Sequence, residues 1–178
     1  RRAFERATAF LLDLGHRRIG FVNGLEFMDF ALRRRSGFED ALAARGIACD
    51  PALMVSEEMT EGSGYRSASR MLDSDNPPSA FLVSSIISAL GVRRAIEERG
   101  FKLGRDKSVV AHDDVLSYLQ NGSDVPIFTA TRSSVREAGR LAAEMLLERI
   151  ANPDTPRQHR LLEAELMVGT STGPFHKD

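Results

Sequence analysis

Apolar residues follow two alternating patterns along this chain. Short runs that are mostly apolar and end at polar residues or glycine predict buried strands, whereas longer segments with apolar residues three or four positions apart predict amphipathic helices. The predicted strands are residues 19–22, 53–56, 80–83, 108–111 and 127–130. The predicted helices are residues 4–14, 31–45, 61–72, 86–98 and 134–150. This alternation predicts an α/β fold with a doubly wound, mostly parallel sheet.

A sheet of this kind binds ligands at the edge formed by the carboxyl ends of its strands. The candidate site therefore consists of the residues that directly follow the last positions of five strands, namely Val22, Ser56, Val83, Ala111 and Ala130.

Composition limits the classes of function. The chain has 178 residues, of which 42% are hydrophobic and 28% charged, so it can form one globular domain with a substantial core. Its 24 Lys and Arg against 25 Asp and Glu leave no overall basic field to attract nucleic acid. The single cysteine, Cys49, excludes an internal disulfide and a Cys-cluster metal site, and it fits a cytosolic location.

No segment predicts a membrane anchor. The longest mostly apolar stretch, residues 80–92, is interrupted by serines and is too short to cross a bilayer of about 30 Å as a helix. Residues 1–14 mix charged and apolar positions, unlike the apolar region of a secretory signal peptide.

Several short motifs bear on chemistry, but each has a plainer explanation. Residues 62–67 form a G-x-G-x-x-S string without the third glycine of a dinucleotide-binding loop, which favours a glycine-rich helix start. Asp113 and Asp114 are neighbours on an extended segment and point to opposite sides, which argues against a catalytic carboxylate pair. His112 and the other histidines lack metal-ligand spacing, and no nucleophile motif surrounds Ser84 or Ser85. The sequence therefore predicts no metal, no cofactor and no enzymatic activity.

Seven segments together resemble one protein family. In chain order they read ATAFLLDLGHRRIGFVNG, RRRSGFEDALAARGI, EGSGYRSASRMLDSDNPPSAFLV, SALGVRRAIEERG, SVVAHDD, FTATRSSVREAGRLAAEMLLERI and ELMVGTSTGPF. In order and spacing they resemble the effector domain of the LacI/GalR transcription regulators over essentially the whole chain. The LGHRRI and STGP strings are the most specific.

The resemblance implies a periplasmic-binding-protein-like fold of type I, in which two α/β lobes are joined by crossovers. Residues 1–130 and about 155–178 would form the second lobe, and residues from about 131 to 152 a helix that returns to an incomplete first lobe. The DNA-binding headpiece and the opening units of the first lobe would precede Arg1. The apolar stripe of the returning helix would then be exposed or covered by another chain.

The resemblance also implies effector contacts. Arg34, three residues before a Gly-Phe pair, resembles the effector-binding arginine of the family, and Asp113 in the AHDD string resembles its hydroxyl- or amine-binding aspartate. A guanidinium and a carboxylate can together hold the hydroxyl groups of a sugar. The remaining predicted contacts are Phe30, Ser85, Asp29 and Met59. For the phenylalanine and the methionine, packing in the core is an equally good explanation.

Three departures from the family pattern affect these contacts. Ser85 and Ile86 stand where SD is usual, AHDD stands where GFDD is usual, and RSS at residues 132–134 stands where RQP is usual. The chain therefore lacks an aspartate and a glutamine of the usual set, although Ser85 can still donate one hydrogen bond.

The implied function is that of a homodimeric, cytoplasmic transcription regulator that responds to a small effector, a sugar or a sugar derivative. Operator DNA would bind only through the headpiece, and no membrane contact is expected. A periplasmic sugar-binding receptor of a transporter is the alternative within the same fold. An α/β enzyme is a weaker alternative, because no nucleophile, base and oxyanion-binding loop can be assembled from these residues.

Overall fold

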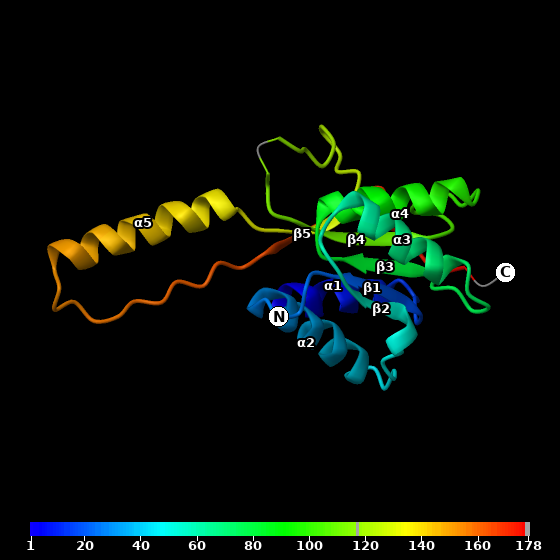
Figure 1. Cartoon of the computed structure of the whole chain (residues 1–178), viewed down its shortest axis with the longest axis horizontal. Coiled ribbons are helices and arrows are strands. Elements are labelled where there is room, and N and C mark those ends of the chain that lie inside the picture. The colour runs from blue at the N-terminus through cyan, green and yellow to red at the C-terminus, as the bar shows by residue number, and fades with distance from the viewer. Residues whose placement is uncertain (117, 177–178) are drawn as a thin grey trace.

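A mostly parallel sheet forms the centre of the molecule (Figure 1). The computed structural model describes residues 1–116 and 118–176. Within them, the strands are β1 (Ile19–Asn23), β2 (Met54–Ser56), β3 (Ala80–Val83), β4 (Ser108–Asp113), β5 (Thr129–Arg132) and β6 (Glu165–Met167). Their order across the sheet is β2-β1-β3-β4-β5-β6, and only the β5–β6 pair is antiparallel. The predicted doubly wound α/β fold is confirmed.

Four helices cover the two faces of this sheet (Figure 1). The helices of the chain are α1 (Arg2–Asp13), α2 (Asp29–Ala43), α3 (Glu61–Leu72), α4 (Ile86–Glu98) and α5 (Val135–Ala151), with one 3-10 turn, η1, at Pro51–Leu53. The first two pack together on one face, and α3 and α4 pack together on the other. Gly15, which follows α1, has a φ of +94°, the left-handed conformation that a glycine commonly adopts at the end of a helix.

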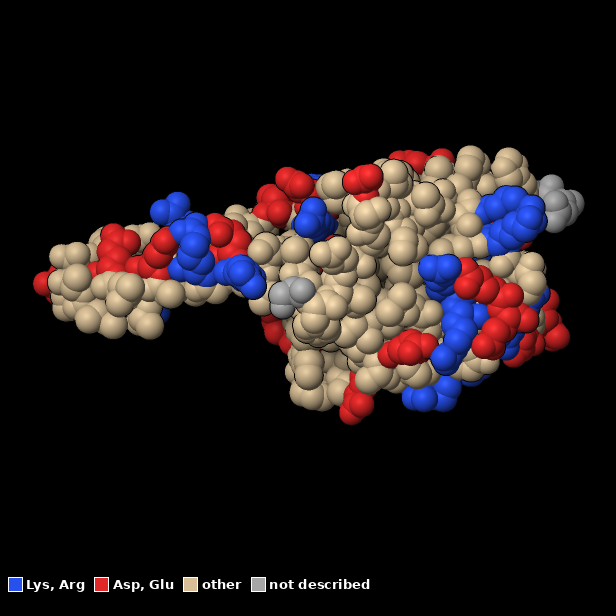
Figure 2. Space-filling model, turned by 90° about the horizontal axis from the view of Figure 1, so that it is seen from above, with Lys and Arg blue, Asp and Glu red and all other residues tan. Residues whose placement is uncertain are grey.

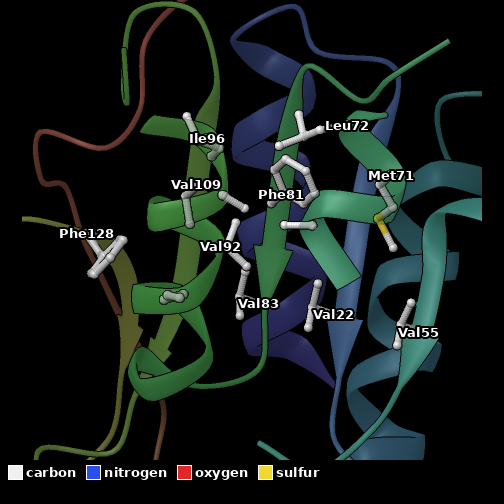
Figure 3. Close-up of a cluster of buried hydrophobic side chains, with 14 of the residues drawn as sticks. Val22, Val55, Met71, Leu72, Phe81, Val83, Val92, Ile96, Val109 and Phe128 are labelled. Carbon is white, nitrogen blue, oxygen red and sulfur yellow. The ribbon is translucent and has the colours of Figure 1, made fainter. Parts of the chain in front are cut away.

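The strands are apolar throughout because both of their faces are buried. Phe81, Val83 and Val109 point toward α3 and α4, in the cluster drawn in Figure 3. The alternate positions Leu82 and Val110 point toward α1 and α2. Each such side chain contributes about 1.5–3 kcal/mol when fully buried, so the two clusters together supply most of the favourable free energy of folding.

Two strand predictions need correction. β5 begins at Thr129 and not at Ile127, because the backbone N–H and C=O of Phe128 both bond to the side chain of Asn121, at 2.8 Å each, instead of to β4. The strand β6 was not predicted at all. It has only three residues, none of them fully buried, and such an edge strand lacks the apolar run that marks the others.

The glycine-rich string at residues 62–67 is part of a close helix contact. A Cβ atom at Gly64 would overlap the backbone of Ser88, and one at Gly91 would overlap the backbone of Glu61. The two glycines let α3 and α4 lie almost backbone to backbone, so packing accounts for this motif. This confirms the interpretation of the string as a helix start and not a nucleotide loop.

A buried histidine joins the two most family-specific strings at the amino ends of the strands. His16 of LGHRRI lies 2.9 Å from Ser79 Oγ through Nδ1, and through Nε2 it lies 3.0 Å from Ser108 Oγ and 3.2 Å from the carbonyl oxygen of Gly173 in STGP. Burial lowers the pKa of His16, although the bond to Gly173 opposes this shift. The neutral imidazole therefore fastens the end of the chain to the sheet.

The helix α5 stands apart from the rest of the molecule (Figure 1). None of its residues is buried, and Leu146, Leu147 and Ile150 are all at least 60% exposed. The expected exposed apolar stripe is therefore present. Of the helices in the described ranges, none combines the length and the apolar character needed to cross a membrane.

Gly91→Ala should lower the free energy of unfolding by about 1–3 kcal/mol, since the new methyl group forces α3 and α4 apart. The matched control is Gly139→Ala in α5, where the added methyl group has no neighbour within 4 Å beyond the local backbone of its own helix. The control should instead stabilise its helix by about 0.5–1 kcal/mol. Urea unfolding of the two variants measures both effects, and equal effects would contradict the packing explanation.

The free energy of unfolding should fall as the pH drops below about 6.5. The unfolded chain binds a proton at His16 more readily than the folded one, because the folded pKa is lowered. The contribution is therefore complete above the unfolded pKa and is lost as the pH falls toward the folded one. Urea unfolding at several pH values between 8 and 5 measures how the free energy of unfolding depends on pH. This dependence should be weaker in His16→Gln than in the wild type. It should be unchanged in His159→Gln, which replaces an exposed histidine and serves as the control.

Candidate functional site

The carboxyl ends of the parallel strands hold a connected set of polar groups. Asn23 ends β1, and its side-chain Nδ2 donates to the carbonyl oxygen of Ala31 in α2, at 3.0 Å. Its Oδ1 accepts a bond of 2.7 Å from Ser84 Oγ, directly after β3. This buried bridge fixes the start of α2 against two neighbouring strands.

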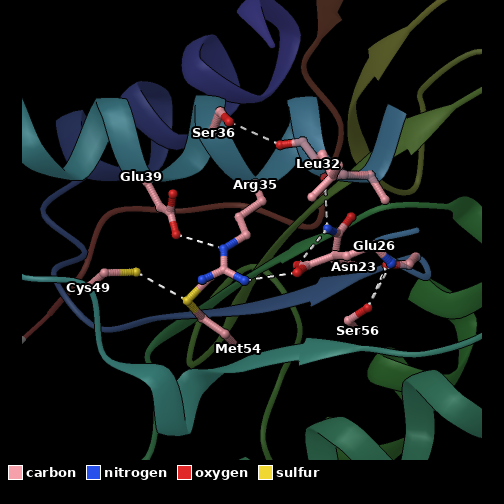
Figure 4. A network of polar contacts seen from close by, with 11 residues as sticks. Asn23, Glu26, Leu32, Arg35, Ser36, Glu39, Cys49, Met54 and Ser56 are labelled. Atoms are coloured by element: carbon pink, nitrogen blue, oxygen red, sulfur yellow. Dashed lines mark hydrogen bonds and ion pairs between the residues drawn. The ribbon is translucent and has the colours of Figure 1, made fainter. Parts of the chain in front are cut away.

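A second network holds the loop between β1 and α2 from the other side (Figure 4). Arg35 pairs with Glu26 at 2.8 Å and with Glu39 at 2.7 Å. The backbone N–H of Glu26 also donates to Ser56 Oγ at the end of β2. Arg35 is thus engaged in holding the loop, and Arg33 makes an exposed ion pair of 2.6 Å with Asp29.

Arg34 lies between these two arginines in sequence, and its partly buried side chain points toward the strand ends. Its Nη1 donates to the carbonyl oxygen of Ser84, at 2.9 Å, and lies 4.0 Å from the sulfur atom of Met59. The guanidinium carbon is 5.1 Å from the ring centre of Phe4 and 4.8 Å from that of Phe30, which places the cation against two aromatic faces. Within the described residues, Nε and Nη2 make no hydrogen bond.

Burial lowers the pKa of Arg34 to about 10, and the charge of Asp114 opposes this shift. The side chain remains a cation at neutral pH, but it carries a desolvation cost that no ion pair within the described residues removes. A partly desolvated cation with free N–H groups is a strong donor for a ligand oxygen.

A polar cluster at the ends of β4 and β5 lies beside this arginine. His112 bonds through Nδ1 to Thr131 Oγ1, at 2.8 Å, and its Nε2 lies 3.0 Å from Asp114 Oδ1 and 3.2 Å from Ser133 Oγ. Burial alone would raise the pKa of Asp114, but the interaction with His112, chiefly a hydrogen bond, and the charge of Arg34 outweigh it and keep the pKa below its usual value.

Two hollows open on this edge. The first has a volume of about 410 Å³, and Arg34, Phe30, His112 and Ser133 line it together with residues 161–164. The second has a volume of about 460 Å³, and its lining includes Asp113, Arg132 and Arg136. Successive residues at the ends of β4 and β5 line different hollows: His112 and Ser133 line the first, and Asp113 and Arg132 line the second. The two hollows therefore lie on opposite sides of these strand ends.

The structure therefore brings together only some of the residues predicted for the site. Arg34, Phe30 and Met59 are neighbours, and Asp29 lies at the exposed start of the same helix. Asp113 lines the other hollow, where its Oδ1 accepts from the backbone N–H of Val115 at 2.8 Å. The carboxylate among the residues that line the Arg34 hollow is that of Glu163, and Asp114 contacts His112 of the same lining.

Ser85 has a structural partner in the chain. Its Oγ accepts from the backbone N–H of Ser88 at 3.1 Å, which makes it the N-cap of α4. Sequence reasoning did not select His112 or Asp114 as site residues. The one signal for them was the histidine in AHDD, where the family pattern has an aromatic residue.

A strand-edge site with a buried cation and an aromatic wall is typical of an α/β ligand-binding domain, and comparison with known proteins specifies the family. The family described as periplasmic binding protein-like domain matches residues 8–172. The HTH-type transcriptional regulator AglR of Rhizobium meliloti (strain 1021) is 45% identical over 173 residues, which cover 97% of this chain and 48% of AglR.

Solved structures agree with this match. A LacI family transcriptional regulator from Enterococcus faecium, with bound ribose, has a TM-score of 0.83 and 26% identity, over 98% of this chain and 64% of that protein. The transcriptional regulator CelR in complex with cellobiose has a TM-score of 0.81 and 29% identity, over 96% of this chain and 50% of CelR.

The chain belongs to the periplasmic binding protein-like domain family, and it corresponds to the effector-binding region of LacI-type regulators. It spans about half the length of the curated relatives it matches. These relatives are transcription regulators and not enzymes, which supports the expectation drawn from the missing catalytic motifs.

Replacing the buried cation should cost little stability if Arg34 serves binding and not folding. Arg34→Met removes the desolvation cost and keeps the apolar stem, so the free energy of unfolding should change by less than about 1 kcal/mol. Phe38→Ala, in the same helix but stacked on Phe21 in the core, should cost about 3–5 kcal/mol. Urea unfolding compares the two, and a loss of similar size for Arg34→Met would make Arg34 a structural residue.

Proposed function

We propose that this chain is the effector-sensing region of a cytoplasmic LacI-type transcription regulator. In this proposal a small polar molecule, a sugar or sugar derivative, binds at the carboxyl edge of the sheet and changes the affinity of the whole protein for operator DNA. A coupling free energy of about 1–3 kcal/mol between the two sites is typical of such control.

The proposal rests mainly on the hydrogen bonding and the surroundings of the Arg34 guanidinium. Its guanidinium is held by the Ser84 carbonyl and two aromatic rings, while Nε and Nη2 have no partner within the described residues. Such a preformed donor favours ligand oxygens, because its orientation costs no further entropy on binding. The ring of Phe30 is about one-third exposed and can stack on the apolar face of a sugar ring.

The remaining predicted contacts take secondary places in the proposal. Asp29 would reach the effector from the exposed start of α2, and Met59 from the loop after β2. Asp113 would contact only a part of the effector that extends past the ends of β4 and β5 into the second hollow. Ser85 takes the last place, because its Oγ caps α4 and its hydroxyl group donates to Ser88 Oγ at 3.1 Å. The ribose and cellobiose bound to the two solved relatives support a sugar as the ligand class.

The proposal assigns residues 1–130 and about 155–178 to the second lobe of a two-lobed domain. Residues from about 131 to 152, which contain α5, would pack in the first lobe, supplied by a segment upstream of Arg1. The exposed Leu146, Leu147 and Ile150 are the apolar surface that such a lobe would cover. A homodimer that holds operator DNA through upstream headpieces completes the arrangement.

A transport receptor is the competing function within the same fold. The named relatives that match nearly the whole chain are transcription regulators, which favours the regulator. On the face shown in Figure 2, blue and red side chains lie next to one another over the body and over α5. This mixed surface supports DNA binding through another part of the protein and not through this region.

Arg34→Ala should weaken effector binding by about 10- to 100-fold, the usual effect of losing hydrogen bonds to a charged group. The protein is tested at its full natural length by calorimetry with a panel of sugars that includes ribose and cellobiose. The control is Arg93→Ala, which removes an exposed arginine paired with Glu97 on α4.

The control should bind like the wild type, and both variants should retain operator binding without effector. Undiminished affinity of Arg34→Ala would discard the site. Failure of the wild type to bind any member of the panel would contradict a sugar as the effector class.

A further inference from the structure

A further hollow opens at the amino ends of the strands. Ser79 directly precedes β3 and Lys107 directly precedes β4, and both line this amino-edge hollow, which has a volume of about 720 Å³. Its other polar side chains are His16, Arg105, Asp106 and His176, and its aromatic rings are Phe101 and Phe175. Because parallel strands begin at one edge of a sheet and end at the other, the amino-edge hollow is separate from the candidate effector site.

The ammonium group of Lys107 is the main donor of this hollow. The residue is only 9% exposed, its Nζ donates to the carbonyl oxygen of Pro78 at 2.9 Å, and Nζ lies 4.9 Å from the ring centre of Phe101. An ammonium group has three N–H donors. Within residues 1–116 and 118–176, the Pro78 carbonyl oxygen is the one acceptor that Nζ reaches. Two donors of a nearly buried cation are therefore left for a ligand.

The carboxylate next to Lys107 in sequence is engaged elsewhere. Asp106 pairs with Arg105 at 2.7 Å and accepts from the backbone N–H of Lys102, also at 2.7 Å. No carboxylate of the described chain forms an ion pair with Lys107. Burial accordingly lowers the pKa of Lys107, although the charge of Asp106 opposes this shift. An anionic ligand would offset the desolvation cost of this cation, whereas a neutral ligand would not.

The two aromatic rings give the hollow apolar walls. Phe101 lies under the Lys107 ammonium group, and Phe175 is 43% exposed. The backbone N–H of Phe175 donates to the carbonyl oxygen of Leu14 at 2.8 Å, and its ring lies 5.7 Å from the ring of His16. These contacts hold Phe175 in place, so a flat apolar ligand would find a preformed surface beside the cation.

We propose that the amino-edge hollow binds a small aromatic carboxylate, with the carboxylate on Lys107 and the ring against Phe101 and Phe175. The charge-assisted hydrogen bond to Nζ supplies the selectivity for an anion, and the two rings supply the selectivity for an aromatic body. The inference concerns the edge of the sheet opposite the candidate effector site, so it does not depend on the proposed function.

The experiment measures the binding of benzoate to the full natural-length protein by calorimetry at constant ionic strength. Benzamide has the same ring without the charge, and acetate has the charge without the ring. The wild type should bind benzoate more tightly than either. Lys107→Met should weaken benzoate binding by about tenfold or more and leave benzamide binding unchanged, because it removes a hydrogen bond between charged groups. Lys102→Met, which replaces a lysine of the same loop outside the lining, should bind like the wild type.

Two further variants complete the set. Phe175→Leu should reduce the preference for benzoate over acetate by about threefold or more, since one aromatic contact is lost. Arg34→Ala should leave benzoate binding unchanged, because Arg34 lies at the opposite edge of the sheet. Urea unfolding identifies any variant that does not fold, and Lys107→Gln replaces Lys107→Met in that case.

The outcomes separate a binding site from simple packing. If the wild type binds benzoate no more tightly than benzamide, or if Lys107→Met keeps its full affinity for benzoate, Lys107 only covers the ring of Phe101 and the site is overturned. Loss of benzoate binding in Arg34→Ala and not in Lys107→Met would also overturn it, because the anion would then bind at the effector edge. The sugar-binding experiments are decided independently of all these results.

Discussion

The register of the parallel strands positions the polar groups that lie at the strand ends of the candidate site. Four residues lie side by side across β1, β3, β4 and β5, namely Val22, Val83, Ala111 and Ala130. Parallel strands end at the same edge, so the next residue of each strand leaves the apolar core at the same depth. The bridge between Asn23 and Ser84 and the bond between His112 and Thr131 both lie in the row of residues that follows these four. A one-residue slip of any strand would turn its polar residue to the opposite face of the sheet.

Alternation along the strands then sorts these residues between the two helix layers. His112 lines the hollow on the side of α1 and α2, where Arg34 lies, whereas Asp113 lines the other hollow. Arg33, Arg34 and Arg35 are sorted in the same way by the helical repeat of α2. Only the middle one turns inward, while its neighbours pair with Asp29 and with Glu26 and Glu39. The site thus depends on the two-residue repeat of the strands and on the helical repeat of α2, which together direct these side chains to one edge of the sheet.

These periodicities explain what could be predicted from the sequence. Buried parallel strands are apolar throughout, so four of the five predicted strands begin where the structure has them or one residue from it. β6 lacked such a signal, and the start of β5 depends on a side chain, Asn121, that competes with the sheet for the backbone of Phe128. Resemblance to a family likewise led to the prediction of Arg34, which lines one of the hollows at this edge. The resemblance did not reveal that Asp113 lines a different hollow from Arg34. A sequence match such as AHDD does not show in which direction each side chain points.

The hollow beside Arg34 also touches both connections to α5. Ser133, which precedes the helix, contacts His112 through its hydroxyl group and donates from its backbone to the carbonyl oxygen of Asp113, at 3.0 Å. The returning segment, residues 161–164, lines the same hollow, and Arg2 and Arg6 of α1 bond to Glu163 and Ala164. A ligand in this hollow would therefore contact the only two covalent links between α5 and the sheet. Since α5 has no buried residue of its own in the described chain, its direction is set by these links. In the proposed regulator, a change at either link would move α5 and whatever packs on it, without any change in the core of the sheet.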